Sequence, residues 1–262
     1  MHSTTNNRRV KLFIQGSYAN NTNVRTQSDV DIAVIQEEVF ITDYRDSSSS
    51  YPQSSADYGI INAENTTPTF KDEVEKSLEP KFGNDVERKD KSIKVYGNTY
   101  RKDADVVPCK RYRDYKLDFR KDVNNYVGGV VIDPDSGGRI INYPEQHIIN
   151  GKKKNNDTNL YYKKMVRISK KIRYLLCDEG YSAANNISSF GLESLLWNIP
   201  DSIFMKYTIY RFEFGEIVNY LHTNKNQIGS YKEANGIKNL CSSVADENNY
   251  KEFIDLLKEF IL

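Results

Sequence analysis

The chain has 262 residues, and its 37 basic and 36 acidic side chains leave a formal net charge of +1. This balance excludes a generic nucleic-acid coat, so no obligatory nucleic-acid partner is expected, although local basic clusters can bind phosphate. Charged residues make up 28% and hydrophobic residues 38%, as in an ordinary soluble protein, and the length suffices for one large domain or two lobes.

The compartment is indicated by what the sequence lacks. Its three cysteines, Cys109, Cys177 and Cys241, lie far apart, which excludes a cysteine zinc site and fits a reducing cytosol. No apolar stretch approaches the ~20 residues that a membrane span requires. The N-terminal MHSTTNNRRVKLF lacks the apolar middle of a signal peptide. We therefore expect a cytoplasmic protein with no membrane partner.

Short strands dominate the first half of the chain. The apolar runs at 10–14 and 30–35 predict two buried strands, separated by a polar, turn-rich segment. Residues 41–67, rich in Ser, Asp, Asn and Tyr, predict a long surface excursion. A helix is expected at 70–82, with Pro80 ending or kinking it.

Further strands and then helices follow. Strands are expected at 92–96 and 100–108, and a hairpin at 127–141. After residue 142 the pattern becomes helical. Strands followed by helices predict a sheet-containing lobe and a helical lobe, with the boundary near Tyr143. The expected helices are 160–176, 192–197, 207–221 and 250–262.

Two acids lie at the beginning of the strand at 30–35, Asp29 just before it and Asp31 within it. Because side chains alternate along a strand, Asp29 and Asp31 project from one face while Val30 projects from the other. Carboxylates at this spacing can share one divalent ion or hold two ions roughly 3.5–4 Å apart. The alternative is the wet face of an edge strand. Gly16 and Ser17 favour the metal site, because such a loop offers close backbone approach, amides and a hydroxyl to phosphate.

A third acid occurs in the segment RKDADVVP at 101–108. Asp105 leads directly into an apolar run, at the junction between core and solvent. Asp103 shares its face and is the second candidate.

These motifs resemble the polymerase-beta-type nucleotidyltransferase superfamily and, within it, the bacterial CD-NTases, which are related to cyclic GMP-AMP synthase and oligoadenylate synthase. The resemblance covers most of the chain, from about residue 13 to residue 200, in the order of the family. The matching segments are GSYANNT at 16–22, SDVDIAV at 28–34, FKDEV at 70–74, KSIKV at 91–95, ADVVP at 104–108, YPEQHIINGKKKN at 143–155, YKKMVRISK at 162–170 and SFGLESLLWNIP at 189–200.

The resemblance implies an α+β fold. Residues 1–143 would form a polymerase-beta-like catalytic core with a mixed sheet and helices, and residues 144–262 a C-terminal helical lobe, with the active site in the cleft between them. The family usually begins with a long helix, whereas fifteen residues precede Gly16. Three alternatives would explain this difference: the chain is truncated, its start is misassigned, or it is regulated differently.

The resemblance also assigns the acids. Asp29, Asp31 and Asp105 would be the catalytic metal ligands for two Mg²⁺ ions, with Mn²⁺ as a substitute, and Asp105 would help to activate the attacking 3′- or 2′-hydroxyl. Ser17, with Gly16, would hold the triphosphate.

A basic stripe follows in the segment YYKKMVRISKKIR at 161–173. Lys163, Arg167 and Lys170 share one helix face, with Lys164 beside them. A solvated face is one reading. In the other, a lysine of this helix binds the triphosphate, and by the resemblance Lys164 takes this role, with Lys163 as the alternative.

Three further residues are candidates for nucleotide binding. By the resemblance, Ser189 would contact phosphates and Phe190 would stack on a base, since every base has a π-face; Phe190 could instead be a core residue. Asn150 could read a base edge, because its amide both donates and accepts, or could be a turn residue at a helix boundary.

The implied function is a Mg²⁺-dependent nucleotidyltransferase that makes a cyclic di- or trinucleotide second messenger from NTPs. ATP, with UTP or GTP, would be the substrates. A separate effector would read the product in a bacterial anti-phage (CBASS) system. The alternatives are a toxin-type nucleotidyltransferase that modifies RNA or protein, and a catalytically silent nucleotide sensor. No H-x-x-x-H pair, Walker A loop or G-x-S-x-G elbow competes with the carboxylate site.

Overall fold

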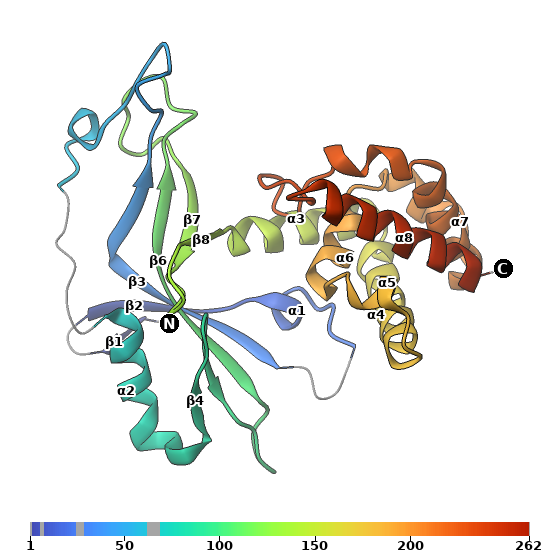
Figure 1. Cartoon of the computed structure of the whole chain (residues 1–262), viewed down its shortest axis with the longest axis horizontal. Helices are drawn as coiled ribbons and strands as arrows, with labels where there is room; N and C mark the ends of the chain where they lie inside the picture. The colour runs from blue at the N-terminus through green and yellow to red at the C-terminus, as the bar shows by residue number, and fades with distance from the viewer. Residues whose placement is uncertain (1, 6–7, 25–28, 62–68, 262) are drawn as a thin grey trace. The chain divides into compact units, whose positions relative to one another are not determined.

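A computed structural model describes residues 2–5, 8–24, 29–61 and 69–261 (Figure 1). The chain forms two compact units. The sheet unit comprises Met1–Gln15 and Gln27–Pro144, and the helical unit comprises Gly16–Thr26 and Glu145–Leu262. The single boundary predicted between residues 143 and 144 therefore needs one correction. The loop that carries Gly16 and Ser17 groups with the helices, and Asn21 and Thr22 just after it hydrogen-bond to Arg167, Lys170 and Glu193 of that unit.

An eight-stranded mixed sheet forms the sheet unit, which confirms the predicted α+β class. The strand order is β1-β2-β3-β6-β5-β4, and β7 pairs with both β6 and β8. Among the described pairs, β3 and β6 run parallel and the others antiparallel. The strands are β1 (His2–Thr5), β2 (Arg8–Ile14), β3 (Val30–Asp43), β4 (Val86–Arg88), β5 (Ile93–Val95), β6 (Ala104–Asp114), β7 (Val127–Ile132) and β8 (Ile140–Asn142).

Both faces of β3 and β6 are covered along part of their length. On one face, helix α2 (Phe70–Phe82) packs on a cluster that contains Val34 and Val106. On the other face, Ile35 and Val107 belong to a second buried cluster with β7 residues. Since side chains alternate, this second face is the one that carries the acids at the beginnings of the two strands.

Helix α2 has the bounds that its sequence predicts, Phe70–Phe82. The Thr69 hydroxyl accepts the amide of Asp72 at 3.3 Å, and the Asp72 carboxylate accepts the amide of Thr69 at 2.8 Å, which forms a capping box. Pro80 does not end this helix, which continues to Phe82, and the alternative that it kinks the helix stays a prediction. A proline at this position lacks the N–H for one intrahelical hydrogen bond, and only two residues of the helix follow it.

The predicted excursion at 41–67 is shorter than expected at its beginning, because β3 continues to Asp43. Its described part packs against the loop that follows β6. The rings of Tyr58 and Tyr115 lie 4.2 Å apart, and the Tyr58 hydroxyl donates to buried Asp118 at 2.9 Å. Residues 62–68 of this prediction lie outside the described residues. Strand β6 likewise begins at Ala104, four residues later than predicted.

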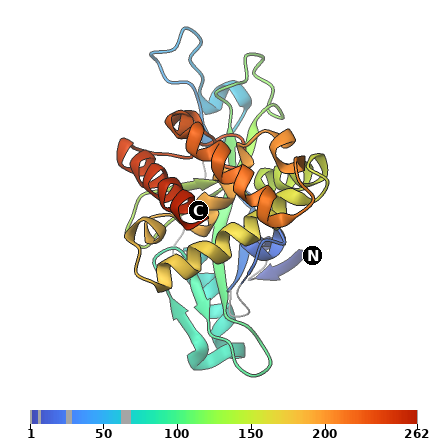
Figure 2. The same cartoon turned by 90° about the vertical axis from the view of Figure 1, so that its right-hand side faces the viewer.

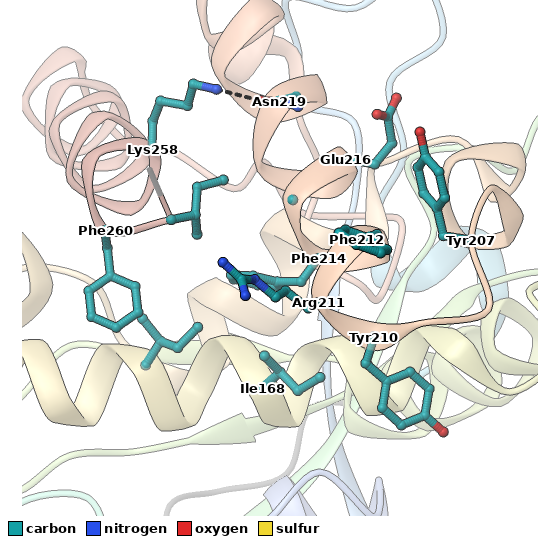
Figure 3. Close-up of a pocket in the computed structure, with 13 residues that line it drawn as sticks. Ile168, Tyr207, Tyr210, Arg211, Phe212, Phe214, Glu216, Asn219, Lys258 and Phe260 are labelled. Atoms are coloured by element: carbon teal, nitrogen blue, oxygen red, sulfur yellow. Dashed lines mark hydrogen bonds between the residues drawn. The ribbon is translucent and has the colours of Figure 1, made fainter.

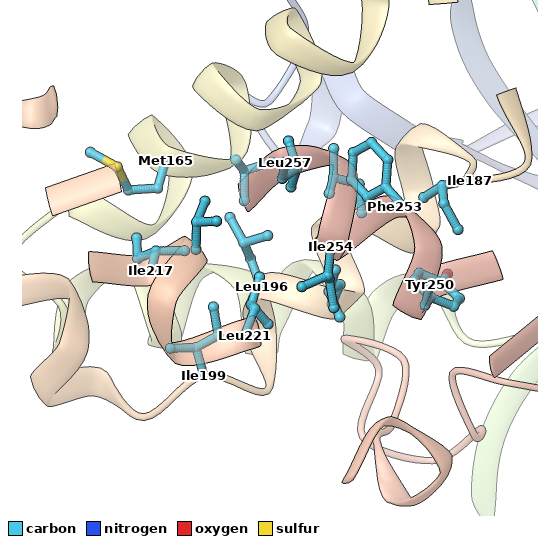
Figure 4. Close-up of a cluster of buried hydrophobic side chains, with 14 of the residues drawn as sticks. Met165, Ile187, Leu196, Ile199, Ile217, Leu221, Tyr250, Phe253, Ile254 and Leu257 are labelled. Carbon is cyan, nitrogen blue, oxygen red and sulfur yellow. The ribbon is translucent and has the colours of Figure 1, made fainter. Parts of the chain in front are cut away.

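The helical unit is built around one large apolar core (Figure 4). Met165, Leu196, Ile217, Phe253 and Leu257 are all at most 1% exposed. Figures 1 and 2 show the two C-terminal helices side by side. The helices of this unit are α1 (Gly16–Ala19), α3 (Pro144–Asp157), α4 (Tyr161–Asp178), α5 (Ser182–Asn185), α6 (Ser189–Trp197), α7 (Tyr210–Thr223) and α8 (Val244–Phe260), with 3-10 turns η3 (Asp201–Met205) and η4 (Lys225–Ser230).

The helices at 160–176, 192–197, 207–221 and 250–262 are confirmed with shifted ends, whereas α3 was not predicted. Its sequence, PEQHIINGKKKNND, is mostly polar, so it lacks the continuous apolar stripe from which a helix can be predicted. Within the described ranges, every helix is too short or too polar to cross a bilayer.

Replacing Phe253 by alanine should test the core of the helical unit. Phe253 is fully buried, so we expect the free energy of unfolding of this unit to fall by ~3–5 kcal/mol, through lost transfer energy and a residual cavity. Val244→Ala, at a position 74% exposed on the same helix, should change it by less than about 0.5 kcal/mol. Chemical denaturation followed by circular dichroism measures both. Similar values for the two variants would contradict this account of the core.

Candidate active site

Strand register brings the predicted acids of the sheet unit together. In the parallel β3–β6 pair, Asp31 is the direct partner of Asp105. One step toward the strand beginnings, the amide of Val30 donates to the carbonyl of Asp103 at 2.9 Å. Asp29, two residues before Asp31, therefore lies on the same face, and four carboxylates gather at one end of the two strands.

A lysine that was not predicted as a site residue lies among these acids. Lys94 on β5 is the register partner of Asp105. Its ammonium donates to Asp29 Oδ2 and lies 3.3 Å from Asp103 Oδ2, with only 12% of the side chain exposed. The segment KSIKV was part of the family resemblance, but its sequence does not reveal which acid faces Lys94. The acids that lie beside Lys94 are determined by the antiparallel pairing of β5 with β6.

The electrostatics of this group are dominated by uncompensated negative charge. Burial, with repulsion from Asp105 and Asp29, raises the pKa of Asp31 to about 6. Burial also raises the pKa of Asp105, with a further contribution from Asp29 and an opposing one from Lys94. One ammonium against four carboxylates is insufficient, so an additional cation at this place would be stabilised.

Asp103, the second candidate, has a different local role. Its Oδ1 accepts the amide of Gly97 at 2.6 Å, and this hydrogen bond, together with Lys94, lowers the pKa of Asp103. A side chain at Gly97 would stand 2.7 Å from the Arg101 carbonyl, so glycine is required by the close approach of the chain. Asp103 thus braces the turn between β5 and β6.

The donor set suits a hard divalent cation. Asp29, Asp31 and Asp105 offer carboxylate oxygens on one sheet face, which is the ligand type that Mg²⁺ and Mn²⁺ take. In the described part of the chain, no three Asp, Glu, His or Cys side chains already converge as a complete ligand group. Lys94 lies against Asp29 instead. The residues fit such an ion in type and charge, provided that Asp29 exchanges the ammonium for it.

In the helical unit, the Gly-Ser loop is attached to the helices. Gly16 has a φ of +66°, a conformation that strongly favours glycine, and the chain then makes the single turn α1. The amide of Thr22 donates to the Ser17 carbonyl at 2.9 Å. The Thr22 hydroxyl donates to Glu193 Oε2 at 2.8 Å, deep in the unit.

Glu193 forms a buried ion pair that the sequence analysis missed. Lys170 Nζ donates to Glu193 Oε2 at 2.9 Å, and both side chains are 3% exposed. His147 Nε2 lies 3.0 Å from Glu193 Oε1. Although burial opposes it, His147 and Lys170 lower the pKa of Glu193 to about 2. The solvated-face reading of the basic stripe is therefore wrong for Lys170. The one available signal was an acid inside the apolar run of α6.

The two candidate triphosphate lysines face different surroundings. Lys164 Nζ lies 5.1 Å from the centroid of the Tyr161 ring and 5.2 Å from that of Tyr210. Lys163 is half-buried, and burial, with repulsion from neighbouring basic groups, lowers its pKa against the opposing charge of Glu193. On the same helix face as Lys163, Arg167 donates to the carbonyl of Asn21 in the Gly-Ser loop at 2.7 Å. Lys163, not Lys164, thus shares the face that holds the loop.

The remaining nucleotide-binding candidates also belong to the helical unit. Phe190 is 46% exposed and stacks on His147 with ring centroids 5.0 Å apart, so the core alternative is wrong. The hydroxyls of Ser189 and Tyr174 lie 2.9 Å apart. Asn150 lies inside α3, which excludes the turn alternative, and its amide donates to the Ala234 carbonyl at 2.9 Å. That bond occupies a donor with which Asn150 could otherwise read a base.

A hollow of about 770 Å³ in the helical unit involves none of the predicted site residues (Figure 3). Aromatic side chains of α7 and the end of α8 line it, among them Phe212 and Phe260, and Arg211 projects into it. The four carboxylates of the sheet unit are therefore not part of this apolar hollow. Their charge is the property that marks them as a candidate site.

Comparisons with known proteins agree on one family. Residues 149–262 match the family described as cGAS/DncV-like nucleotidyltransferase C-terminal helical domain. Over 252 residues the chain is 46% identical to cyclic GMP-AMP synthase CdnE03 of Staphylococcus schleiferi. This match spans 96% of this chain and 76% of that relative. It is 41% identical over 225 residues to a cyclic dipyrimidine nucleotide synthase CdnE of Cecembia lonarensis, covering 86% and 73% of the two chains.

A solved structure extends the likeness to three dimensions. Rhodothermus marinus CdnE c-UMP-AMP synthase with Apcpp and Upnpp superposes with a TM-score of 0.82 at 30% identity, over 97% of this chain and 85% of that one. The mixed sheet and the C-terminal helical domain match those of solved nucleotidyltransferases of this type. The chain belongs to the CD-NTase family of cyclic nucleotide synthases. It is an enzyme that makes cyclic nucleotides from NTPs, in a class that generally uses a divalent metal.

Removing the charge of Glu193 should test the buried ion pair. Glu193→Gln leaves Lys170 buried without a counter-charge, so we expect the free energy of unfolding at pH 7 to fall by ~3–5 kcal/mol. The pKa of Glu193 is lowered from 4.5 to about 2, so its stabilising effect is complete above 4.5 and is lost as the pH falls toward 2. The difference in the free energy of unfolding between wild type and Glu193→Gln should therefore be smaller at about pH 3 than at pH 7.

Urea denaturation at the two pH values measures this difference. Glu252→Gln, at an exposed position of α8, is the matched control and should change the free energy of unfolding by less than about 0.5 kcal/mol. A gap between wild type and Glu193→Gln that is equally wide at both pH values would contradict a depressed pKa.

Proposed function

We propose that Asp29, Asp31 and Asp105 hold two Mg²⁺ ions, replaceable by Mn²⁺, at which two nucleotides are joined. The observation that supports this most is the pairing of Asp31 with Asp105, together with the raised pKa of Asp31. Bound ions of this kind lower the pKa of an acceptor ribose hydroxyl and neutralise charge on the transferred phosphate. Asp105, whose own pKa is raised, is suited to accept the proton of that hydroxyl at its carboxylate.

The donor triphosphate would be bound by residues of the helical unit. Ser17 supplies a hydroxyl, Gly16 permits close approach of the backbone, and Lys163 supplies a positive charge that is paired with no carboxylate at short range in the described residues. We prefer Lys163 to Lys164 because Lys163 lies on the face of α4 that contacts the loop. The exposed ring of Phe190 would stack on a base, and Ser189 would contact phosphate.

The proposed product is a cyclic dinucleotide made from ATP and GTP, since the relative from Staphylococcus schleiferi, at 46% identity, is a cyclic GMP-AMP synthase. UTP is the other substrate to test, because the Rhodothermus marinus structure holds Upnpp. We further propose that the enzyme acts in the bacterial cytoplasm, in anti-phage defence, and that a separate effector reads its product.

Asp31→Asn tests the carboxylate site. The amide keeps the shape of the side chain and removes its charge, so we expect cyclic product to fall at least about 10²-fold, the size of losing one group that stabilises transition-state charge. Asp103→Asn is the matched control, because an amide oxygen can still accept the Gly97 amide, and activity should stay within a few-fold.

Mass spectrometry after incubation with all four NTPs and Mg²⁺ reads out the experiment. A small, phosphatase-resistant product is expected from the wild type. Label that appears only on added RNA or protein would instead indicate the toxin-type activity. Equal product from Asp31→Asn and wild type would remove the catalytic role of the acids.

Lys94→Met tests the competition between the ammonium and the metal. Without Lys94, Asp29 is free to bind the ion, so we expect Mn²⁺ to bind about tenfold more tightly in the absence of nucleotide, a difference of ~1.4 kcal/mol. The metal-free variant should also unfold at a lower temperature than wild type, because four acids have lost their counter-charge. Calorimetric titration with Mn²⁺ measures the affinity. Exposed Lys91→Met is the control, and weaker binding by Lys94→Met would contradict this account.

A further inference from the structure

Thr22 joins the Gly-Ser loop to a buried ion pair of the helical unit. It is fully buried, and its backbone amide and its hydroxyl have partners of different kinds. The backbone amide donates to the Ser17 carbonyl at 2.9 Å. The hydroxyl donates to Glu193 Oε2 at 2.8 Å and accepts from Lys170 Nζ at 3.0 Å. One residue thus connects the backbone of Ser17 with a fixed pair of opposite charges.

The ion pair is itself held by three helices. Lys170 lies on α4 and Glu193 on α6, and His147 of α3 approaches Glu193 Oε1 at 3.0 Å. The Tyr162 hydroxyl also donates to the Glu193 carbonyl at 3.0 Å. These contacts leave Glu193 Oε2, the oxygen that accepts from the Thr22 hydroxyl, little freedom to move, since both Glu193 carboxylate oxygens have polar partners.

Packing alone does not fix the loop. Helix α1, which contains Gly16 and Ser17, includes no buried residue. The loop is held by polar contacts farther along, at Asn21, whose carbonyl accepts from Arg167 at 2.7 Å, and at Thr22. Burying an ion pair costs desolvation and contributes little to stability by itself. Such a pair can, however, define a position sharply, because charge-assisted hydrogen bonds are short and directional.

We propose that Thr22, held by the Lys170–Glu193 pair, is the positioning residue that sets where Ser17 meets the donor triphosphate. The inference rests on the proposed role of Ser17. It assigns to Thr22 an effect on NTP binding without any contact between Thr22 and the nucleotide. Two hydrogen bonds of Thr22 make the link: its hydroxyl donates to Glu193, and its backbone amide donates to the Ser17 carbonyl.

Thr22→Val tests the link, because valine keeps the shape and removes the hydroxyl. We expect the KM for NTP and the Kd for the non-hydrolysable analogue Apcpp to rise about tenfold, with kcat changed less than about threefold, since the lost bond involves charged groups. Thr22→Ser retains the hydroxyl and should restore both values to within about twofold. Hydrogen exchange of segment 15–24 should also be faster in the valine variant.

Two controls separate this role from general destabilisation and from failure of the underlying proposal. Thr158→Val removes another fully buried hydroxyl of the same unit, and it should lower thermal stability without a change in KM. Ser17→Ala should raise KM if the loop binds the triphosphate. A raised KM in Ser17→Ala with no change in Thr22→Val would overturn the positioning role and leave the proposed function intact. No change in either variant would overturn both.

Discussion

The parallel pairing of β3 with β6 is the constraint on which the catalytic face depends. It sets Asp31 beside Asp105 and, through β5, sets Lys94 beside both. Because side chains alternate with a period of two, a slip of one residue would turn the acids toward the apolar cluster beneath α2. The irregularity in this pair lies between Gln36 and Phe40, well beyond the acids. The register near the site is therefore regular, and both covered faces of the strands enforce it.

The same strands balance burial against charge. Their middles are apolar on both faces, whereas their beginnings carry acids on the face that the second cluster leaves open. Repulsion among these acids would destabilise the sheet if nothing opposed it. Lys94 supplies part of the missing positive charge from within the fold, and the hydrogen bonds to Asp29 and Asp103 raise the pKa of Lys94 although burial opposes this. Lys94 thus offsets part of this repulsion from within the sheet itself.

How far the sequence predicts this structure depends on the distance over which each feature is determined. The faces of Asp29, Asp31 and Asp105 follow from local alternation, and the mixed sheet and most helices follow from periodicity. The partners of Thr22 do not, since Lys170 and Glu193 lie 148 and 171 residues away along the chain. The choice between the adjacent lysines of α4 was also beyond local pattern. Helical geometry separates neighbours by about 100° in rotation, and only the packed neighbours show which one faces the loop.

The assignment of residues Gly16–Thr26 to the helical unit has a consequence for dissecting the enzyme. The polypeptide passes between its two units three times, so neither unit is a contiguous piece that can be expressed by cutting the gene once. A fragment that starts at Glu145 would bury Lys170 and Glu193 without the threonine that completes their hydrogen bonding. Chimaeras that exchange C-terminal halves between relatives would create mismatched seams at the same place. A compatible exchange must transplant the short N-terminal insert together with the helices.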